Sequence, residues 1–87
     1  MIDSSLRDQI IHRLLASSDA KVAAAEVTDA TSLRDDLDIS SLILITLASE
    51  LEGALNIEFE DEELGRIQTI GELFEAIEKS QRRSRSA

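Results

Sequence analysis

Residues 37–55 read LDISSLILITLASELEGAL, an acidic loop that runs directly into a strongly apolar segment. Ser40 supplies a side-chain oxygen of the kind that caps a helix N-terminus. From Ser41 onward the apolar residues recur at the i, i+3, i+4, i+7 spacing of one helix face, at Leu44, Leu47, Ala48, Leu51 and Leu55. The stretch therefore predicts a helix over 41–55 that packs one stripe against a core, and it indicates a fold built from helices.

Two other segments have the same helical spacing. Residues 4–17 place apolar side chains on one face, with Ser4 or Ser5 available as the N-cap. Residues 70–77 do the same behind Thr69, which is expected to cap them. The chain has no proline, only three glycines and 2% aromatic residues, so its core consists of aliphatic side chains of the kind that packed helices use.

The remaining segments are short or lack periodicity. Residues 56–59 are an extended connector with Ile57 and Phe59 pointing inward, and residues 60–65 are expected to form one or two acidic helical turns. Residues 18–40 are a long loop, which in so small a domain is functional or held down by its own side chains. Its expected anchors are Val22, Val27 and Leu33, and the alanine run Ala23-Ala24-Ala25 favours a short helical turn.

The architecture that results is all-α, a four-helix bundle of three longer helices and one short helix, with the long loop between the first two. Short connections between the later helices favour up-down packing with the long loop crossing the outside, and no β-sheet is needed. We assign residues 1–80 to a single domain. Residues 81–87 end the polar and basic stretch SQRRSRSA and are predicted to be a disordered tail in solvent.

The charge of the chain is strongly negative, at −9 from 18 acidic and 9 basic residues. Three of the basic residues lie among the last six positions, so residues 1–80 hold only six against all 18 acids. Such a surface repels nucleic acid and anionic membranes and favours partners with basic patches. No apolar run approaches the roughly 20 residues that span a bilayer. No signal pattern is present at the start, so a cytoplasmic protein is expected. We also expect the protein to be a monomer.

Side chains for catalysis or metal binding are scarce. There is no cysteine, and the single histidine, His12, has no second histidine with which to share a metal. An enzyme would need a nucleophile with a base, or a metal site, and no Ser-His-Asp set is recognisable. Consecutive acids are more often a solvated face than a cation site, and this applies to Glu58, Glu60, Asp61, Glu62 and Glu63.

Ser40 and Ser41 differ in their position relative to the second helix. Ser40 fits the N-cap, because a residue there accepts the free amides of the first turn. Ser41 is then the first helical residue, with its hydroxyl facing solvent where a helix N-terminus favours a phosphate ester. On spacing alone two interpretations stay open. Both serines serve only to cap the helix, or Ser41 is modified by another protein.

Several short motifs occur in a characteristic order. Leu37-Asp38-Ile39-Ser40-Ser41-Leu42 is followed by Glu50-Leu51-Glu52, Ile57-Glu58-Phe59, Asp61-Glu62-Glu63, Ile67-Gln68-Thr69-Ile70 and Leu73. In order and spacing, the stretch from Leu33 to Ile77 resembles the acyl carrier protein family. Members of that family have a leucine, a glycine, a variable residue and then Asp-Ser-Leu at the start of their second helix. The serine motif is weakly specific by itself, whereas the ordered set is specific.

The resemblance implies an acyl-carrier-protein-like four-helix bundle that is a carrier and not an enzyme. It implies that Ser41 receives 4′-phosphopantetheine from coenzyme A, through a phosphodiester formed by a separate phosphopantetheinyl transferase. The thiol of that arm would hold an acyl or aminoacyl group as a thioester and present it at high effective concentration. A loading ligase and downstream transferases are then the implied partners. The lack of cysteine agrees with a thiol that belongs to the prosthetic group.

Three departures from the family's pattern bear on backbone and partners. Ser40 stands where Asp is usual, and Asp38 stands where Gly is usual, so the backbone at Asp38 is expected to avoid a conformation that only glycine favours. Carriers of primary fatty-acid synthesis typically have acids soon after the serine. This chain has no acid between Ser41 and Glu50, and its segment after the serine begins Leu42, Ile43, Leu44, Ile45 and Thr46.

That apolar segment has two interpretations. Ile43 and Ile45 are part of the core, or some of the apolar surface is exposed and meets a partner. The second interpretation predicts a specialised carrier in a dedicated pathway, because loss of the acidic face alters partner choice. The candidate partner-binding residues are Ser40, Leu42, Ile43, Ile45 and Thr46.

An alternative function is an unmodified acidic docking module that binds a partner enzyme without carrying a group. The substitution Ser41→Ala would leave the activity of such a module intact and abolish that of a carrier. The cargo of a carrier stays open among fatty acyl, polyketide and aminoacyl groups, because no long hydrophobic cavity is recognisable from the sequence.

Overall fold

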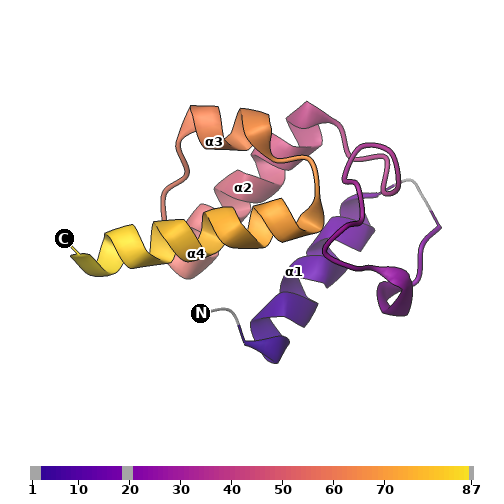
Figure 1. The fold of residues 1–87 in the computed structure, drawn as a ribbon, viewed down its shortest axis with the longest axis horizontal. Helices are drawn as coiled ribbons and strands as arrows, with labels where there is room; N and C mark the ends of the chain where they lie inside the picture. Colours follow the sequence, from indigo (N-terminus) through magenta and orange to yellow (C-terminus); the bar gives the residue numbers. More distant parts are fainter. Residues whose placement is uncertain (1–2, 19–20, 87) are drawn as a thin grey trace.

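Four α-helices and one 3₁₀ helix make up the structure, a computed structural model that describes residues 3–18 and 21–86, with side chains through residue 83 (Figure 1). Those residues contain no strand, and their only bridge is an isolated one between Ser32 and Thr69. The predicted all-α class is confirmed. The helices are α1 (Ser4–Ser17), η1 (Ala24–Glu26), α2 (Ser41–Leu55), α3 (Asp61–Arg66) and α4 (Ile70–Ser86).

One apolar core holds the helices together, because burial of aliphatic surface is the main driving force that a chain of this composition has. The predicted stripe of α2 is confirmed, with four of its residues buried and Leu55 half-buried against them. Ile57 and Phe59 of the connector after α2 point inward as expected. The buried apolar residues of the helices are Ile10, Ile11, Leu14, Leu44, Leu47, Ala48, Leu51, Ile70, Leu73, Phe74, Ala76 and Ile77.

The long connection between α1 and α2 runs around the outside of the end where α2 and α4 begin (Figure 1). All three of its expected anchors contact the core, Leu33 as a buried residue and Val22 and Val27 as half-buried ones. Its backbone also binds the start of α4, since Leu33 N donates to Gln68 O at 2.9 Å and Ile70 N donates to Thr31 O at 3.1 Å. The connection is therefore fixed in place just before the start of α2.

The helix starts follow the sequence with two corrections. Asp3 caps α1, where its Oδ1 accepts the N–H of Leu6 at 2.8 Å, so the prediction of Ser4 or Ser5 as the cap is wrong. A carboxylate is as good an acceptor here as a hydroxyl, and it also interacts favourably with the helix dipole. Helix α3 begins and ends one residue later than expected. Thr69 caps α4 as predicted, with its Oγ1 accepting the N–H of Glu72 at 3.2 Å.

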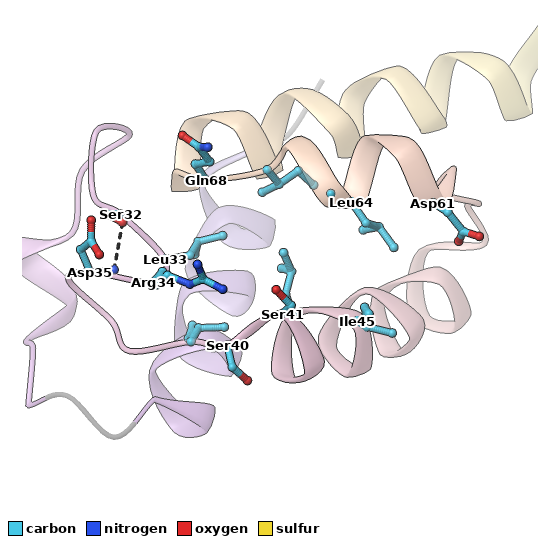
Figure 2. A pocket seen from close by; sticks show the side chains of 14 residues that line it. Ser32, Leu33, Arg34, Asp35, Ser40, Ser41, Ile45, Asp61, Leu64 and Gln68 are labelled. Atoms are coloured by element: carbon cyan, nitrogen blue, oxygen red, sulfur yellow. Dashed lines mark hydrogen bonds between the residues drawn. The ribbon is translucent and has the colours of Figure 1, made fainter.

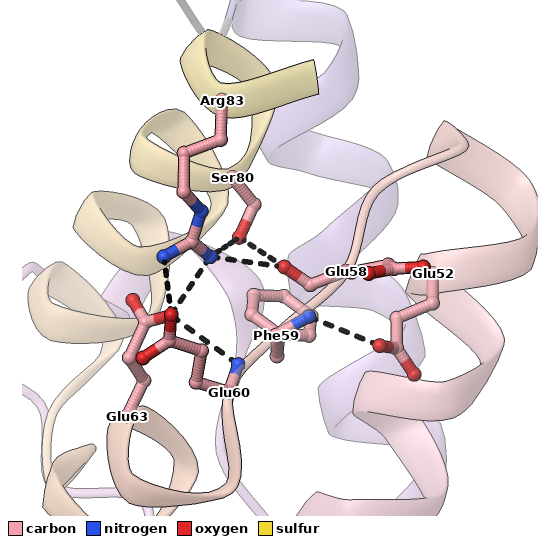
Figure 3. A network of polar contacts seen from close by, with 7 residues as sticks. All are labelled: Glu52, Glu58, Phe59, Glu60, Glu63, Ser80 and Arg83. Carbon is pink, nitrogen blue, oxygen red and sulfur yellow. Dashed lines mark hydrogen bonds and ion pairs between the residues drawn. The ribbon is translucent and has the colours of Figure 1, made fainter. Parts of the chain in front are cut away.

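The C-terminal segment is helical and differs most from its predicted structure. Helix α4 continues to Ser86, so the predicted disordered tail is wrong for residues 81–86, and Ala87 lies outside the described residues. Ser80 is buried, and its hydroxyl donates to the carbonyl of Glu58 at 2.8 Å. Arg83 folds back onto the acidic connector and α3, as Figure 3 shows, instead of extending into solvent. These side-chain contacts join the last turns of α4 to the connector and α3 and so support the longer helix.

Candidate functional site

Ser40 and Ser41 lie at the N-terminus of α2 and have different environments. Ser40 is the N-cap, with its Oγ accepting the N–H of Ile43 at 3.3 Å, as the sequence predicts. Ser41 is the first helical residue and is exposed, and its hydroxyl makes no hydrogen bond within the described part of the chain. Figure 2 shows the Ser41 hydroxyl turned toward the cleft beside α3 and the Ser40 hydroxyl turned away from it. The hydroxyl of Ser41 is therefore accessible and is not used by the fold.

The loop before these serines holds Asp38 in an unexpected conformation. Its φ of 53° lies in the left-handed region, so the expectation that Asp38 avoids a glycine-like backbone is wrong. Aspartate is one of the few non-glycine residues that adopt this region with some frequency. Leu37 and Ile39 on either side are both buried, and Ile39 N donates to Leu33 O at 2.8 Å. These anchors impose the turn at Asp38 and set the direction in which the chain enters α2.

A cleft of about 740 Å³ lies beside Ser41, between the start of α2, α3 and the turn at residues 32–35 (Figure 2). Its polar mouth includes Ser41, Arg34 and Gln68. Its apolar wall comes from Leu33, Ile39, Leu44, Leu64 and Ile67. The sequence indicates neither the cleft nor a role for Arg34, because the lining comes from three segments that no single periodic pattern joins.

The first two turns of α2 expose apolar surface. Leu42 is 73% exposed and Ile45 is 52% exposed, and their i, i+3 spacing places them side by side on the helix. Thr46 is exposed beside them and donates its hydroxyl to the carbonyl of Leu42 at 3.1 Å. Ile43 is half-buried and packs against the core, whereas Leu44 is fully part of it. Of the two interpretations of this segment, exposure holds for Leu42 and Ile45 and partial burial holds for Ile43.

The acidic segment around α3 pairs with Arg83 (Figure 3). Arg83 Nη2 donates to Glu63 Oε1 at 2.8 Å, and Arg83 Nη1 lies 3.4 Å from Glu60 Oε1. Partial burial of the Glu63 carboxylate acts to raise its pKa, but the hydrogen bond from Arg83, the N–H of Glu60 and the charges of Arg83 and Lys79 outweigh burial and lower the pKa below 4.5. Among residues 3–18 and 21–86, no group of three or more acidic or histidine side chains is arranged to hold a metal.

Comparison with known proteins gives the same family as the motifs. Residues 10–77 match the family described as "phosphopantetheine attachment site". The acyl carrier protein of Rubrobacter xylanophilus is 34% identical over 77 residues, which cover 86% of this chain and 95% of that protein. The acyl carrier protein of Thermobifida fusca is 37% identical over 60 residues, covering 69% of this chain and 76% of that protein.

A further similarity is to a carrier with a more specific name. The meromycolate extension acyl carrier protein of Mycolicibacterium aurum is 34% identical over 58 residues, or 67% of this chain. The match spans only 60% of the length of that relative. It supports the family without assigning a pathway to this chain.

The fold, the serine at the start of α2 and these matches together define a phosphopantetheine-dependent carrier. The chain belongs to the acyl carrier protein family. It is a carrier of acyl groups rather than a catalyst, and its cofactor is covalently attached 4′-phosphopantetheine. The site suits that group, because Ser41 is exposed, its hydroxyl is uncommitted and the adjoining cleft is open. Within the described residues, no helix combines the length and apolar character needed to cross a membrane.

Proposed function

We propose that this protein carries an acyl or aminoacyl group on a 4′-phosphopantetheine arm attached at Ser41, and that it serves a dedicated pathway. Ser41 is supported as the attachment residue by the different roles of the two serine hydroxyls. The hydroxyl of Ser40 is used in capping α2, whereas that of Ser41 is exposed and uncommitted. When bound, the arm supplies a thiol on which the cargo is held as a thioester.

The chain itself contributes position and not proton transfer. Ser41 lies on the first turn of α2, and the buried stripe of α2 packs in the core. The Ser41 hydroxyl is therefore held at one place on the surface. No histidine lies among the residues that line the cleft. Activation of the Ser41 hydroxyl is therefore left to the phosphopantetheinyl transferase, in agreement with a protein that acts as a substrate.

Intact-protein mass spectrometry tests the attachment. Wild type, Ser40→Ala and Ser41→Ala are incubated with coenzyme A and a promiscuous phosphopantetheinyl transferase, with an established carrier as the positive control. Wild type and Ser40→Ala are expected to gain one phosphopantetheine, and Ser41→Ala none. A gain of phosphopantetheine in Ser41→Ala would show that Ser41 is not the attachment residue. No gain in any of the three proteins, with several transferases, would favour the unmodified docking module.

The exposed apolar surface of α2 supports a dedicated set of partners. We infer that Leu42 and Ile45 are its main contacts, with Ser40, Thr46 and the accessible part of Ile43 around them. Leu42 is 73% exposed and Ile45 is 52% exposed, so these apolar side chains face water instead of packing in the core. Adjacent exposed apolar residues of this kind are typical of an interaction surface. An enzyme that docks here would present an apolar patch, whereas enzymes with strongly basic docking surfaces would find no acid in these two turns.

A gain-of-function substitution tests the partner surface. The double variant Leu42→Glu/Ile45→Glu restores acids to the first turns of α2 and leaves the core untouched. In reconstituted fatty-acid synthesis, wild type is expected to be a poor carrier and the double variant a better one. Ser49→Glu/Ala54→Glu, at two exposed positions farther along α2, is the charge-matched control. If wild type equals the housekeeping carrier in rate, the dedicated-pathway proposal fails.

The apolar wall of the cleft supports a cargo with an apolar part. Leu44, Leu64 and Ile67 form that wall next to Ser41, so an alkyl chain on the arm would bury surface there at a gain of about 25 cal/mol per Å². The melting temperature of the loaded carrier should then rise with acyl chain length, from acetyl to octanoyl. A melting temperature that is independent of chain length, and equal for a glycyl cargo, would favour an aminoacyl carrier instead.

A further inference from the structure

The cleft beside Ser41 contains a single cationic side chain, that of Arg34. Arg34 is exposed and makes no hydrogen bond or ion pair with any described residue. Arg66 of α3 also makes none, but it does not line the cleft. By contrast, Arg7 pairs with Asp29 at 2.7 Å, and Arg83 pairs with Glu63 at 2.8 Å.

The carboxylates that neighbour Arg34 in the sequence, or that line its cleft, make no ion pair with its guanidinium. Asp36 uses its carboxylate to accept the N–H of Ser32 at 2.7 Å. The carboxylate of Asp35 points away from Arg34, and Asp61 lies at the other end of the cleft (Figure 2). Figure 2 shows the Arg34 side chain extended toward Ser41 instead. The protein thus keeps an unpaired positive charge next to its exposed serine.

The backbone around Arg34 is held by hydrogen bonds, so the position of Arg34 beside the cleft is set by the fold. Leu33 is buried, and its N–H donates to Gln68 O at 2.9 Å. On the other side, Asp35 N donates to Ser32 Oγ at 3.0 Å. Arg34 therefore projects from a turn that is held at both ends, and only its long side chain has freedom to adjust to a ligand.

We propose that Arg34 is a positioning residue that binds the phosphodiester joining Ser41 to the 4′-phosphopantetheine arm. The inference rests on the proposed attachment at Ser41. A guanidinium presents a planar fork of N–H donors that matches two phosphate oxygens, and such charge-assisted hydrogen bonds are short and strong. The diester adds a negative charge to a protein that is already acidic, and Arg34 is the cation of the cleft that offsets it. The contact directs the first part of the arm along the cleft instead of into solvent.

The phosphorus nucleus of the arm reports on this contact without any partner enzyme. The ³¹P resonance of the holo protein is measured for wild type, Arg34→Gln, Arg34→Lys and Arg66→Gln at low and high salt. Arg66 is the matched control, because it is an exposed arginine on α3 that does not line the cleft. The resonance should move in Arg34→Gln, move less in Arg34→Lys and stay in place in Arg66→Gln. High salt should bring wild type toward Arg34→Gln, because it screens the pair.

A second measurement needs no substitution in the cleft. In wild type labelled with ¹⁵N-arginine, the Nε–H signal of Arg34 should shift when apo protein is converted to holo, while that of Arg66 stays constant.

The change in melting temperature from apo to holo should also be about 1–4 °C less favourable in Arg34→Gln than in wild type. An unmoved ³¹P resonance in Arg34→Gln together with an unmoved Arg34 Nε–H signal would overturn the inference.

Failure of the inference and failure of the proposed function give different results. The mass of each protein is recorded first. If wild type and Arg34→Gln both gain phosphopantetheine but their ³¹P spectra coincide, Arg34 has no role toward the diester and Ser41 remains the attachment residue. If wild type gains the group at another residue, the attachment proposal fails, and the inference fails with it.

Discussion

The hydroxyl of Ser40 accepts the backbone N–H of Ile43 at 3.3 Å, so one of the two adjacent serines at the start of α2 is committed to the helix. Loss of a capping oxygen costs about 1 kcal/mol. Ser40→Ala should therefore lower the free energy of unfolding by about 1 kcal/mol in urea denaturation and still accept phosphopantetheine. Ser41→Ala should do the reverse, with near-normal stability and no modification. Equal stability losses in the two variants would contradict this division.

The contact between Gly71 and Asp29 makes a second prediction. A Cβ at Gly71 would lie 3.0 Å from the carbonyl oxygen of Asp29, which also accepts the N–H of Gly71 at 2.9 Å. Gly71→Ala should therefore push the long connection away from α4 and destabilise the fold by about 1 kcal/mol or more. Gly53→Ala is the matched control, because its Cβ would meet nothing within 4 Å. That change should stabilise α2 by about 0.5–1 kcal/mol in thermal unfolding.

The Arg83–Glu63 pair predicts a pH dependence of stability. The pKa of Glu63 is lower in the folded protein than its usual 4.5, so the folded state favours the ionised carboxylate. The stabilisation is complete above the unfolded-state pKa and is lost as the pH falls through the folded-state value. Arg83 is 45% exposed, so solvent screening keeps the stability loss in Arg83→Gln small at neutral pH. The stability difference between wild type and Arg83→Gln should shrink between about pH 5 and pH 3.

Lys21→Gln is the control for that experiment. Lys21 is exposed in the long connection, far along the chain from Arg83, and its removal changes the net charge by the same amount. Its stability difference from wild type should stay nearly constant over the same pH range. A constant difference for Arg83→Gln as well would show that Glu63 does not titrate through this pair.

The acidic surface predicts a response to salt. With 18 acidic and 9 basic residues, like charges repel across the folded protein more than ion pairs attract. Raising the ionic strength from about 0.01 M to about 0.15 M shortens the screening length from roughly 30 Å to roughly 8 Å. The melting temperature of the apo protein should therefore rise over this range, and rise further with divalent cations. A melting temperature that does not change with salt would contradict net self-repulsion.

Features encoded within one segment are predicted well from the sequence. The bounds of α1 and α2 and the Ser40 cap match the structure, because apolar spacing and a capping oxygen are both local signals. The same local signals place Ile57 and Phe59 in the core. Exposure of Leu42 and Ile45 required the structure, because an all-apolar turn does not tell which of its sides the rest of the fold covers.

Features that depend on distant contacts are not predicted. Residues 80–86 lack apolar spacing, and their helix is supported by bonds from Ser80 and Arg83 to Glu58, more than twenty residues earlier in the chain. The left-handed backbone of Asp38 follows from the burial of its two neighbours, which overrides its own preference. Arg34 lines the same cleft as Ser41 because the turn at 32–35 is hydrogen-bonded to the start of α4.

Site-localised mass spectrometry of the wild-type protein tests the central claim most directly. Trypsin cleaves after Arg34 and Arg66 and nowhere between them, so Ser40, Ser41 and Ser49 lie in one peptide. After incubation with coenzyme A and a phosphopantetheinyl transferase, fragment ions that break the bond between Ser40 and Ser41 locate the added group. The account predicts phosphopantetheine on Ser41 alone. The group on Ser40 or Ser49, or a peptide that stays unmodified while an established carrier is fully converted, would contradict it.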